Sequence, residues 1–240
     1  MTDDPIDPIP ERLYPSKAAL MPALAQAIAE RLAAAVTARG VASLVATGGS
    51  TPGPLYDALH NADLPWERVL VTLTDERWVD PADEASNDHL VRTRLLVGRA
   101  ASARYAPFKT ADATPEAAAA KLDATIARLP RPFDVIVLGM GDDGHVASLF
   151  PGADETRAAA DLEAPALVCP VEREGAARAA ARMSLTFRAL REAVFTAVLI
   201  EGQAKLDVAR RAKAGTDVNE LPVRGVLNDP PGEVEIWWAP

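Results

Sequence analysis

The chain has little of what marks secreted, disulfide-bonded or membrane proteins. It has one cysteine, Cys169, among 240 residues, so neither an internal disulfide nor a Cys-x-x-Cys metal site can form. The N-terminal stretch MTDDPIDPIP is acidic and rich in proline, the opposite of a signal peptide. No apolar run approaches the roughly 20 residues that a membrane span needs. We therefore expect a cytoplasmic protein with no membrane partner.

Basic residues are also in the minority. The sequence holds 25 Lys and Arg against 34 Asp and Glu, which gives a formal net charge of -9. A nucleic-acid surface needs a basic patch, so we expect no nucleic-acid partner. A small anionic substrate is still compatible with this composition, because a few local cations are enough to bind it.

Apolar residues, by contrast, are plentiful. They make up 49% of a chain long enough for one large α/β domain or two small ones. No linker rich in Pro, Gly or Ser divides the sequence, so we expect a single domain over residues 16–240. Residues 1–15 contain four prolines and no hydrophobic period, which predicts an extended N-terminal arm.

Short apolar runs alternate with segments of helical period along the chain. This alternation is typical of an α/β fold with a mostly parallel sheet and helices on both faces. The strands read as continuous apolar runs, as expected when both faces of a sheet are covered. We predict helices at 16–39, 53–61, 86–96, 115–128 and 202–213, and strands at 41–47, 68–74, 133–138, 166–171, 194–200 and 234–238.

Three polar loops each follow one of the predicted strands. They are GGSTP after strand 41–47, DER after strand 68–74 and GMGDDGH after strand 133–138. In an open parallel sheet, ligands bind beyond the carboxyl ends of the strands. The three loops are therefore expected to converge on one cleft.

The first loop has the composition of a phosphate-binding turn. Its backbone N–H groups and two hydroxyls suit a phosphate, with the candidate residues Gly48, Gly49, Ser50 and Thr51. An ordinary tight turn with Ser or Thr as the helix cap explains the same residues equally well. The loop is neither a GxxxxGK[ST] nor a GxGxxG motif.

The third loop places a histidine at the end of a strand. His145 is a candidate general base whose ring Asp143 or Asp75 would orient, and Arg77 is a candidate grip for a carboxylate or phosphate. The alternative for the His145 loop is a surface loop whose aspartates cap the next helix. The alternative for Arg77 and its neighbours is an ordinary solvated charge cluster. Residues 172–174 and 188–192 are interpreted as solvated surface.

Several segments, in their order and spacing, resemble the 6-phosphogluconolactonase family from about residue 11 to the C-terminus. They are GGSTPGPLY, TDERWV followed by Ser86-Asn87, VLGMGDDGHVASLFPG, RMSLT at 182–186, GQAK at 202–205, LPVRGVL and EIWW. DGHVASLFP is the most specific of them. The resemblance implies a three-layer α/β/α fold of the glucosamine-6-phosphate deaminase type.

The same resemblance implies an activity and a set of roles. The activity is hydrolysis of 6-phospho-D-glucono-1,5-lactone in the oxidative pentose phosphate pathway, without organic cofactor or obligatory metal. Separately from the resemblance, we expect a monomer or weak dimer. Arg182 and Lys205 would hold the phosphate with the Gly48–Thr51 loop, and His145 would activate water. Asp75 and Arg77 would lie near the lactone. The oxyanion donor is left open between Arg77 and backbone N–H groups near Gly141 and Gly144.

Two other functions compete with this one. A deaminase of the same fold carries the pattern DGHxAFNEP, and its glutamate transfers protons. Here Phe150 stands at that place, and a phenylalanine cannot transfer protons. A non-enzymatic sugar-phosphate sensor would need the phosphate loop but not His145. It would also be expected to carry a helix-turn-helix or basic extension, which this sequence lacks.

Overall fold

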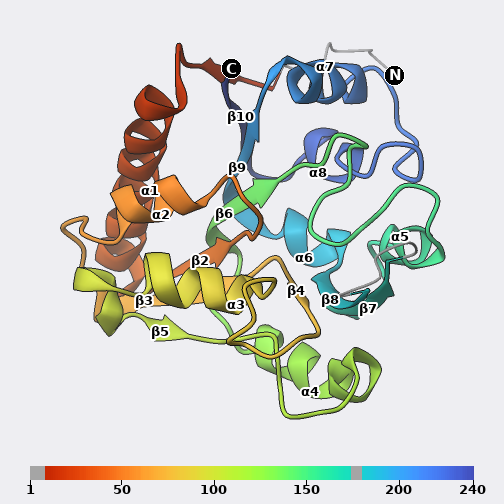
Figure 1. Ribbon diagram of the computed structural model, residues 1–240, viewed down its shortest axis with the longest axis horizontal. Helices are drawn as coiled ribbons and strands as arrows, with labels where there is room; N and C mark the ends of the chain where they lie inside the picture. The colour runs from red at the N-terminus through yellow and green to blue at the C-terminus, as the bar shows by residue number, and fades with distance from the viewer. Residues whose placement is uncertain (1–8, 174–179) are drawn as a thin grey trace.

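The computed structural model describes residues 9–173 and 180–240, and its centre is a parallel sheet (Figure 1). Within those residues the sheet has seven strands, and every neighbouring pair is parallel. In spatial order they are β1 (Glu11–Leu13), β10 (Glu233–Ala239), β9 (Ala193–Glu201), β6 (Phe133–Gly139), β2 (Ala42–Ala46), β3 (Val69–Leu73) and β5 (Arg104–Tyr105).

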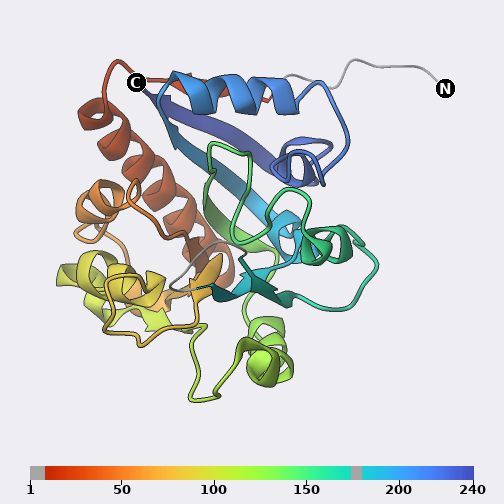
Figure 2. The ribbon, with the colours of Figure 1, turned by 45° about the vertical axis from the view of Figure 1, so that its right-hand side comes forward.

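Helices cover both faces of this sheet. Helices α1 (Lys17–Arg39) and α2 (Gly53–Leu59) lie on one side, and α4 (Pro115–Ala127), α6 (Phe187–Arg191) and α7 (Gln203–Ala212) on the other (Figure 2). The expected three-layer α/β/α design is confirmed. The shorter elements are η1 (Trp66–Arg68), α3 (Asn87–Leu90), the π-helical turn η2 (Val91–Leu95), η3 (Gly98–Ser102), α5 (Asp154–Ala159) and α8 (Arg224–Leu227).

The ends of the helices follow from local chemistry. The Ser16 side chain accepts the Ala19 N–H at the start of α1, and Gly40 ends that helix with φ +75°. Ser86 caps α3 through the His89 N–H, and Thr114 caps α4 through the Ala117 N–H. The helix expected over 86–96 is therefore real, but its second half is the π-helical turn η2.

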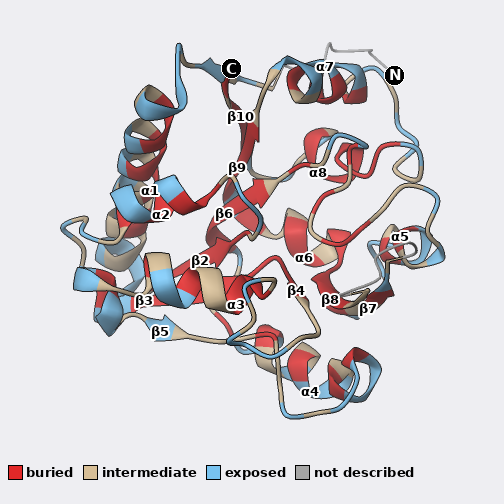
Figure 3. Cartoon of the chain, viewed as in Figure 1, coloured by how far each residue is buried: buried red, intermediate tan, exposed pale blue. Residues whose placement is uncertain are grey.

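Helix α1 is apolar and long enough, by length and composition, to pass for a membrane span. In this fold its Leu20, Leu24, Ile28 and Leu32 side chains are fully buried in the core. Its exposed side carries most of its polar residues, so one face is red and the other pale in Figure 3. The apolar composition of α1 is therefore explained by packing against the sheet and α2.

A second, smaller sheet stands beside the first. It is antiparallel, with the order β4 (Asp75–Arg77), β8 (Ala181–Leu185) and β7 (Val168–Glu172). The segment Asp75–Arg77, expected as a loop, is thus a short strand paired with β8, and β8 itself was not predicted. The strand expected at 166–171 is β7, which joins this sheet rather than the parallel one.

Part of the predicted N-terminal arm belongs to the central sheet. Glu11–Leu13 form β1 at its edge and pair in parallel with β10, from Glu11 beside Ile236 to Leu13 beside Trp238. Residues 1–8 of the predicted arm lie outside the described residues. The division between the arm and the domain at residue 16 stays a prediction.

The order of the strands fixes where a ligand is expected. After β2 the chain continues to β3 on one side, and it later returns as β6 on the other side of β2. The loops that leave β2 and β6 therefore diverge over opposite faces and leave a crevice at the carboxyl edge of the sheet. The two glycine-containing loops of the sequence follow these two strands.

Candidate active site

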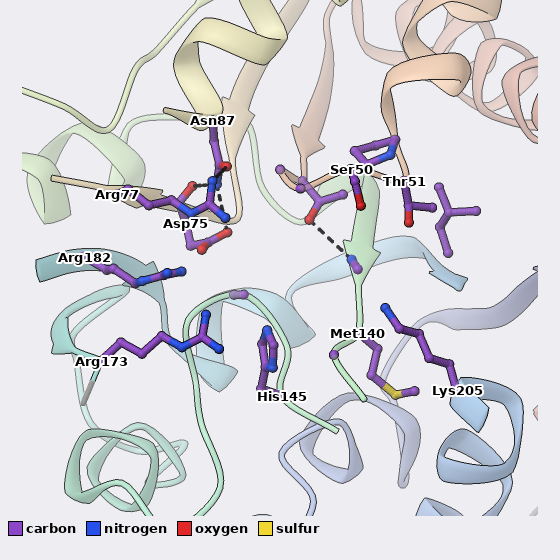
Figure 4. A pocket seen from close by; sticks show the side chains of 18 residues that line it. Ser50, Thr51, Asp75, Arg77, Asn87, Met140, His145, Arg173, Arg182 and Lys205 are labelled. Carbon is purple, nitrogen blue, oxygen red and sulfur yellow. Dashed lines mark hydrogen bonds between the residues drawn. The ribbon is translucent and has the colours of Figure 1, made fainter. Parts of the chain in front are cut away.

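A cavity of about 180 Å³ opens at this carboxyl edge (Figure 4). It draws its walls from the loops after β2 and β6, from β4 and β8 of the small sheet, and from the start of α7. The expected convergence of the three loops is confirmed, because Ser50, Asp75 and His145 all line it. Its wall includes nine of the predicted site residues: Gly48, Gly49, Ser50, Thr51, Asp75, Arg77, His145, Arg182 and Lys205.

The loop after β2 is fastened to its neighbours through Thr47. The Tyr56 hydroxyl donates to the Thr47 carbonyl at 2.5 Å, and burial raises the pKa of Tyr56, so it remains a neutral donor. The Thr47 hydroxyl accepts the Gly139 N–H at 3.3 Å, which ties this loop to the end of β6. Gly49 has φ +92°, in the left-handed region that glycine tolerates. These hydrogen bonds of Thr47 fix the point from which the Gly48–Thr51 turn extends over the cavity.

The loop after β6 folds back on itself around His145. The Gly141 N–H donates to the His145 carbonyl at 3.0 Å, and the Gly144 N–H donates to the Gly141 carbonyl at 3.0 Å. A Cβ on Gly141 would lie 2.1 Å from Nδ1 of His145, so only glycine fits beneath the ring. This compact turn presents the imidazole to the cavity.

Asp143 is the carboxylate that orients this ring. Its Oδ1 lies 2.5 Å from Nδ1 of His145 and also accepts the His145 backbone N–H at 3.1 Å. Burial opposes the charge on Asp143, but the hydrogen bonds and attraction from His145 outweigh it and hold the pKa of this carboxyl below its ordinary value. An ionised acceptor at Nδ1 fixes the proton there, which leaves Nε2 as the basic nitrogen. Asp143 itself lines an adjoining hollow rather than the main cavity.

Asp75 has a different set of partners. Its Oδ2 accepts the Ser148 hydroxyl at 2.6 Å, and its Oδ1 accepts the Thr74 hydroxyl at 3.0 Å and the Asn87 amide at 3.3 Å. The residue is buried, and its oxygens are occupied by these donors. Of the two aspartates proposed to orient His145, the geometry therefore selects Asp143. Asp75 instead organises the floor beside β8.

Three arginines gather on the Asp75 side of the cavity: Arg77, Arg173 and Arg182 (Figure 4). Arg182 is only 6% exposed, and burial lowers its pKa to about 10, although the nearby charge of Asp75 opposes this shift. The buried Nε atoms of Arg77 and Arg182 have no hydrogen-bond partner. Three guanidinium groups in one wall make this end of the cavity suited to an anion or a developing negative charge.

The interpretation of Arg173 as solvated surface was wrong. Arg173 follows β7 and reaches the cavity, where its guanidinium lies 4.9 Å from the centre of the Phe150 ring. Arg182 approaches the same ring at 5.6 Å, and the His145 ring lies 4.8 Å from it. Phe150 is thus a shared platform under one imidazole and two guanidiniums. Glu174, from the same charged stretch, lies outside the described residues.

Lys205 completes the cationic lining from another direction. It belongs to the first turn of α7, and its Nζ lies 4.0 Å from Asp142. Figure 4 shows Lys205 on the side of Ser50 and Thr51, with Arg182 across the cavity beyond His145. The expectation that both cations act on one phosphate stays a prediction.

Other lining residues were not assigned a role from the sequence. They include Asn87, whose side chain bonds Asp75 and Arg77, and Met140, which lies beside Lys205 in Figure 4. In the sequence Ser86-Asn87 is only a matching pair of residues, because a neutral amide carries no charge or nucleophile that marks it as part of a site. Residues 9–173 and 180–240 contain no cluster of three or more His, Cys, Asp or Glu side chains suited to a metal ion.

Comparisons with known proteins identify the family and the fold of this chain. The family model described as glucosamine-6-phosphate isomerases/6-phosphogluconolactonase matches residues 15–238. A 6-phosphogluconolactonase of Rhizobium meliloti is 43% identical over 228 residues, which cover 95% of this chain and 97% of the relative. The crystal structure of a 6-phosphogluconolactonase from Shewanella baltica is 38% identical, with a TM-score of 0.93 over 98% of this chain and 99% of that one.

A more distant structure shows how far the fold extends. A monomeric glucosamine-6-phosphate deaminase superposes with a TM-score of 0.77 over 96% of this chain and 97% of that one. At 15% identity this likeness shows the fold alone, and it confirms the expected deaminase-like architecture. With the family model and the two closer relatives spanning nearly the whole sequence, the chain belongs to the glucosamine-6-phosphate isomerase/6-phosphogluconolactonase family.

Proposed function

We propose that this protein hydrolyses 6-phospho-D-glucono-1,5-lactone to 6-phospho-D-gluconate, the lactone-opening step of the oxidative pentose phosphate pathway. One observation carries the proposal. A histidine oriented by Asp143 stands in a cavity that also holds Lys205 and three arginines. Such a cavity supplies a base for water and cations for a phosphate, which are the two requirements of this substrate. The 6-phosphogluconolactonase names of the relatives support it.

In this proposal the substrate phosphate binds to the Gly48–Thr51 turn, with Lys205 and Arg182 as the cations. The turn offers hydroxyls and backbone N–H groups, and the hydrogen bonds of Thr47 fix the point where the turn leaves β2. A phosphate held here anchors the sugar ring relative to His145. Because this grip is the same in the ground and transition states, it serves substrate affinity more than the chemical step.

The chemical step uses His145 as general base and then as general acid. Nε2 takes a proton from water while the water oxygen bonds to lactone C1, which gives a tetrahedral oxyanion. When the oxyanion collapses, the bond from C1 to the ring oxygen breaks, and Nε2 returns its proton to that oxygen. Asp143, ionised beside Nδ1, stabilises the imidazolium formed between these steps. A base of this kind contributes about 10² to 10⁴ in rate.

The oxyanion donor is assigned here to Arg77, which lines the cavity and is not one of the cations assigned to the phosphate. The N–H groups of Gly141 and Gly144, the other candidates from the sequence, already donate to carbonyls within their own turn. A guanidinium placed before the reaction stabilises the developing charge without reorganisation. The mechanism proposed here requires no organic cofactor or metal.

A deaminase activity is the nearest alternative. Phe150 occupies the place where a deaminase has a proton-transferring glutamate, and it packs against the ring of His145. The ring therefore has an apolar neighbour where that reaction needs a second acid or base. A sensor that only binds sugar phosphates gives no reason for the paired Asp143 and His145.

One set of assays separates the three functions. The purified protein is given freshly prepared lactone, and 6-phosphogluconate formation is followed within minutes and corrected for spontaneous opening. We expect a rate well above the blank, and no ammonia from glucosamine 6-phosphate. Ammonia release would favour the deaminase. Tight binding of 6-phosphogluconate without acceleration of lactone opening would favour the sensor.

A further inference from the structure

The side chain of Asn87 lies where three separate segments of the site meet. It is 2% exposed and touches the turn after β2, the strand β4 and the cavity itself. Figure 4 shows it above Asp75 and Arg77, joined to both by hydrogen bonds. A buried amide in this position connects groups that are far apart in the sequence.

The hydrogen bonds of Asn87 fix which way its amide points. Nδ2 donates to the Asp75 carbonyl at 2.8 Å and to Asp75 Oδ1 at 3.3 Å, while Oδ1 accepts Arg77 Nη1 at 2.9 Å. A guanidinium can only donate and a backbone carbonyl can only accept, so the opposite orientation would lose both bonds. The amide therefore sets the distance between a carboxylate and a cation of the site.

The same side chain explains why residue 48 is glycine. A Cβ on Gly48 would lie 1.8 Å from Oδ1 and 2.0 Å from Cγ of Asn87. Gly48 does not have a left-handed φ, so its backbone would accept an alanine. What excludes a side chain at Gly48 is the volume that Asn87 occupies. The phosphate-binding turn thus rests directly on this amide.

The buried carboxyl group of Glu76 fixes the backbone at Asn87. Glu76 accepts the Asn87 and Asp88 backbone N–H groups, each at 2.7 Å, and the Ser86 hydroxyl at 3.0 Å. This leaves the start of α3 little freedom to move relative to β4. The Asn87 amide is therefore a fixed spacer rather than an adaptable surface group.

We propose that Asn87 is a positioning residue that holds Arg77 and Asp75 at a set distance from the Gly48 turn. This role rests on the proposed function. The spacing matters because, in that proposal, the turn holds the phosphate and Arg77 meets the oxyanion. Asn87 acts through these neighbours, and a displacement of about 1 Å is enough to cost on the order of 10² in rate.

The test uses Asn87→Ala, Gly48→Ala and the double variant. Each single variant is expected to lower kcat by about 10- to 10²-fold. Asn87→Ala removes the amide, and Gly48→Ala displaces the same amide with its added Cβ. The double variant is expected to be no worse than Asn87→Ala alone, because the two changes act on one contact. Losses that multiply in the double variant, or an Asn87→Ala enzyme with wild-type kcat, would overturn the proposal.

Asn87→Asp is the matched variant of nearly identical shape. It keeps an acceptor for Arg77 but replaces the donor to Asp75 with a second negative charge, so we expect a loss of kcat as large as for alanine. Wild-type activity in Asn87→Asp would show that the amide donor is not needed. Calorimetric titration with 6-phosphogluconate should still give one site per chain. A reduced number of sites would indicate misfolding and reject a positioning role.

Thermal unfolding separates this inference from the proposed function. The cycle between positions 48 and 87 is also measured as melting temperature, which does not depend on any substrate. A wild-type protein that fails to hydrolyse the lactone would overturn the proposed function while the cycle still reports the contact. Active wild type with additive changes in melting temperature would overturn the inference alone.

Discussion

Oδ1 of Asp143 lies 2.5 Å from Nδ1 of His145 and accepts the backbone N–H of the same residue at 3.1 Å. One carboxylate oxygen thus fixes both the ring and the main chain of the proposed base. The pKa of Asp143 is held below its ordinary value, so this acceptor stays ionised across the neutral range. The hydrogen bond that orients the His145 ring is therefore expected to persist over the same range.

Asp143→Asn tests the orienting role. The amide keeps the shape but no longer stabilises the imidazolium, so kcat should fall by about 10- to 10²-fold. This is less than the roughly 10⁴-fold loss for a buried triad aspartate, because the Asp143 side chain is 48% exposed. An unchanged kcat would contradict this assignment.

His145→Ala tests the base itself. We expect kcat to fall by about 10² to 10⁴ while 6-phosphogluconate still binds, because the phosphate grip does not use the imidazole. The measurement pairs initial rates with calorimetric binding of the product. His89→Ala is the control, since His89 lies outside the cavity. Near wild-type kcat in His145→Ala would end the proposed mechanism and make Asp75 the next base to test.

Lys205→Ala tests the phosphate grip. It should raise KM by roughly 10-fold or more and leave kcat within about threefold, because a bound phosphate is held alike in both states. Lys213→Ala removes the same charge near the other end of α7, where Lys213 pairs with Glu11, and KM should not change. If Lys205→Ala binds 6-phosphogluconate as tightly as wild type, Lys205 does not hold the phosphate.

Phe150→Leu tests the platform beneath His145 and the two arginines. Removing the ring face should lower kcat by about 3- to 30-fold, since cation–π contacts of about 0.5–2 kcal/mol and the packing of the imidazole are lost. Phe108→Leu is the matched control, a fully buried phenylalanine away from the cavity. It should lower the melting temperature without lowering kcat. Equal kinetic effects at the two positions would remove the platform argument.

The raised pKa of Glu76 predicts an unusual dependence of the free energy of unfolding on pH. Burial raises the pKa of this carboxyl from 4.5 to about 7, against four hydrogen bonds that favour its charge. Between these values the folded state binds the proton more tightly than the unfolded state, so this group makes the free energy of unfolding fall as pH rises. Urea unfolding of wild type and Glu76→Gln from pH 4.5 to 7.5 measures the effect. Parallel stability curves for the two proteins would contradict it.

Local chemistry was enough to predict five of the seven strands of the central sheet and most of its helices, whereas the edge strands β1 and β5 were not predicted as strands. The runs at 41–47, 133–138 and 194–200 are continuous apolar stretches because both faces of the sheet are covered, and they became β2, β6 and β9. The caps at Ser86 and Thr114 act over three residues, so the local sequence is enough to identify them. The small sheet escaped prediction because β4 and β8 are far apart in the chain and are joined only by tertiary pairing.

By itself, then, the sequence determined a parallel α/β fold with three polar segments at one edge and His145 among them, since these follow from local periodicity and from the geometry of parallel strands. Only the tertiary structure decided which aspartate orients His145, because Asp75 and Asp143 are equally plausible until their partners are seen. It also decided that Arg173 reaches the cavity and that Gly48 is small to admit Asn87. Those outcomes depend on distances between residues remote in the sequence, which no local pattern encodes.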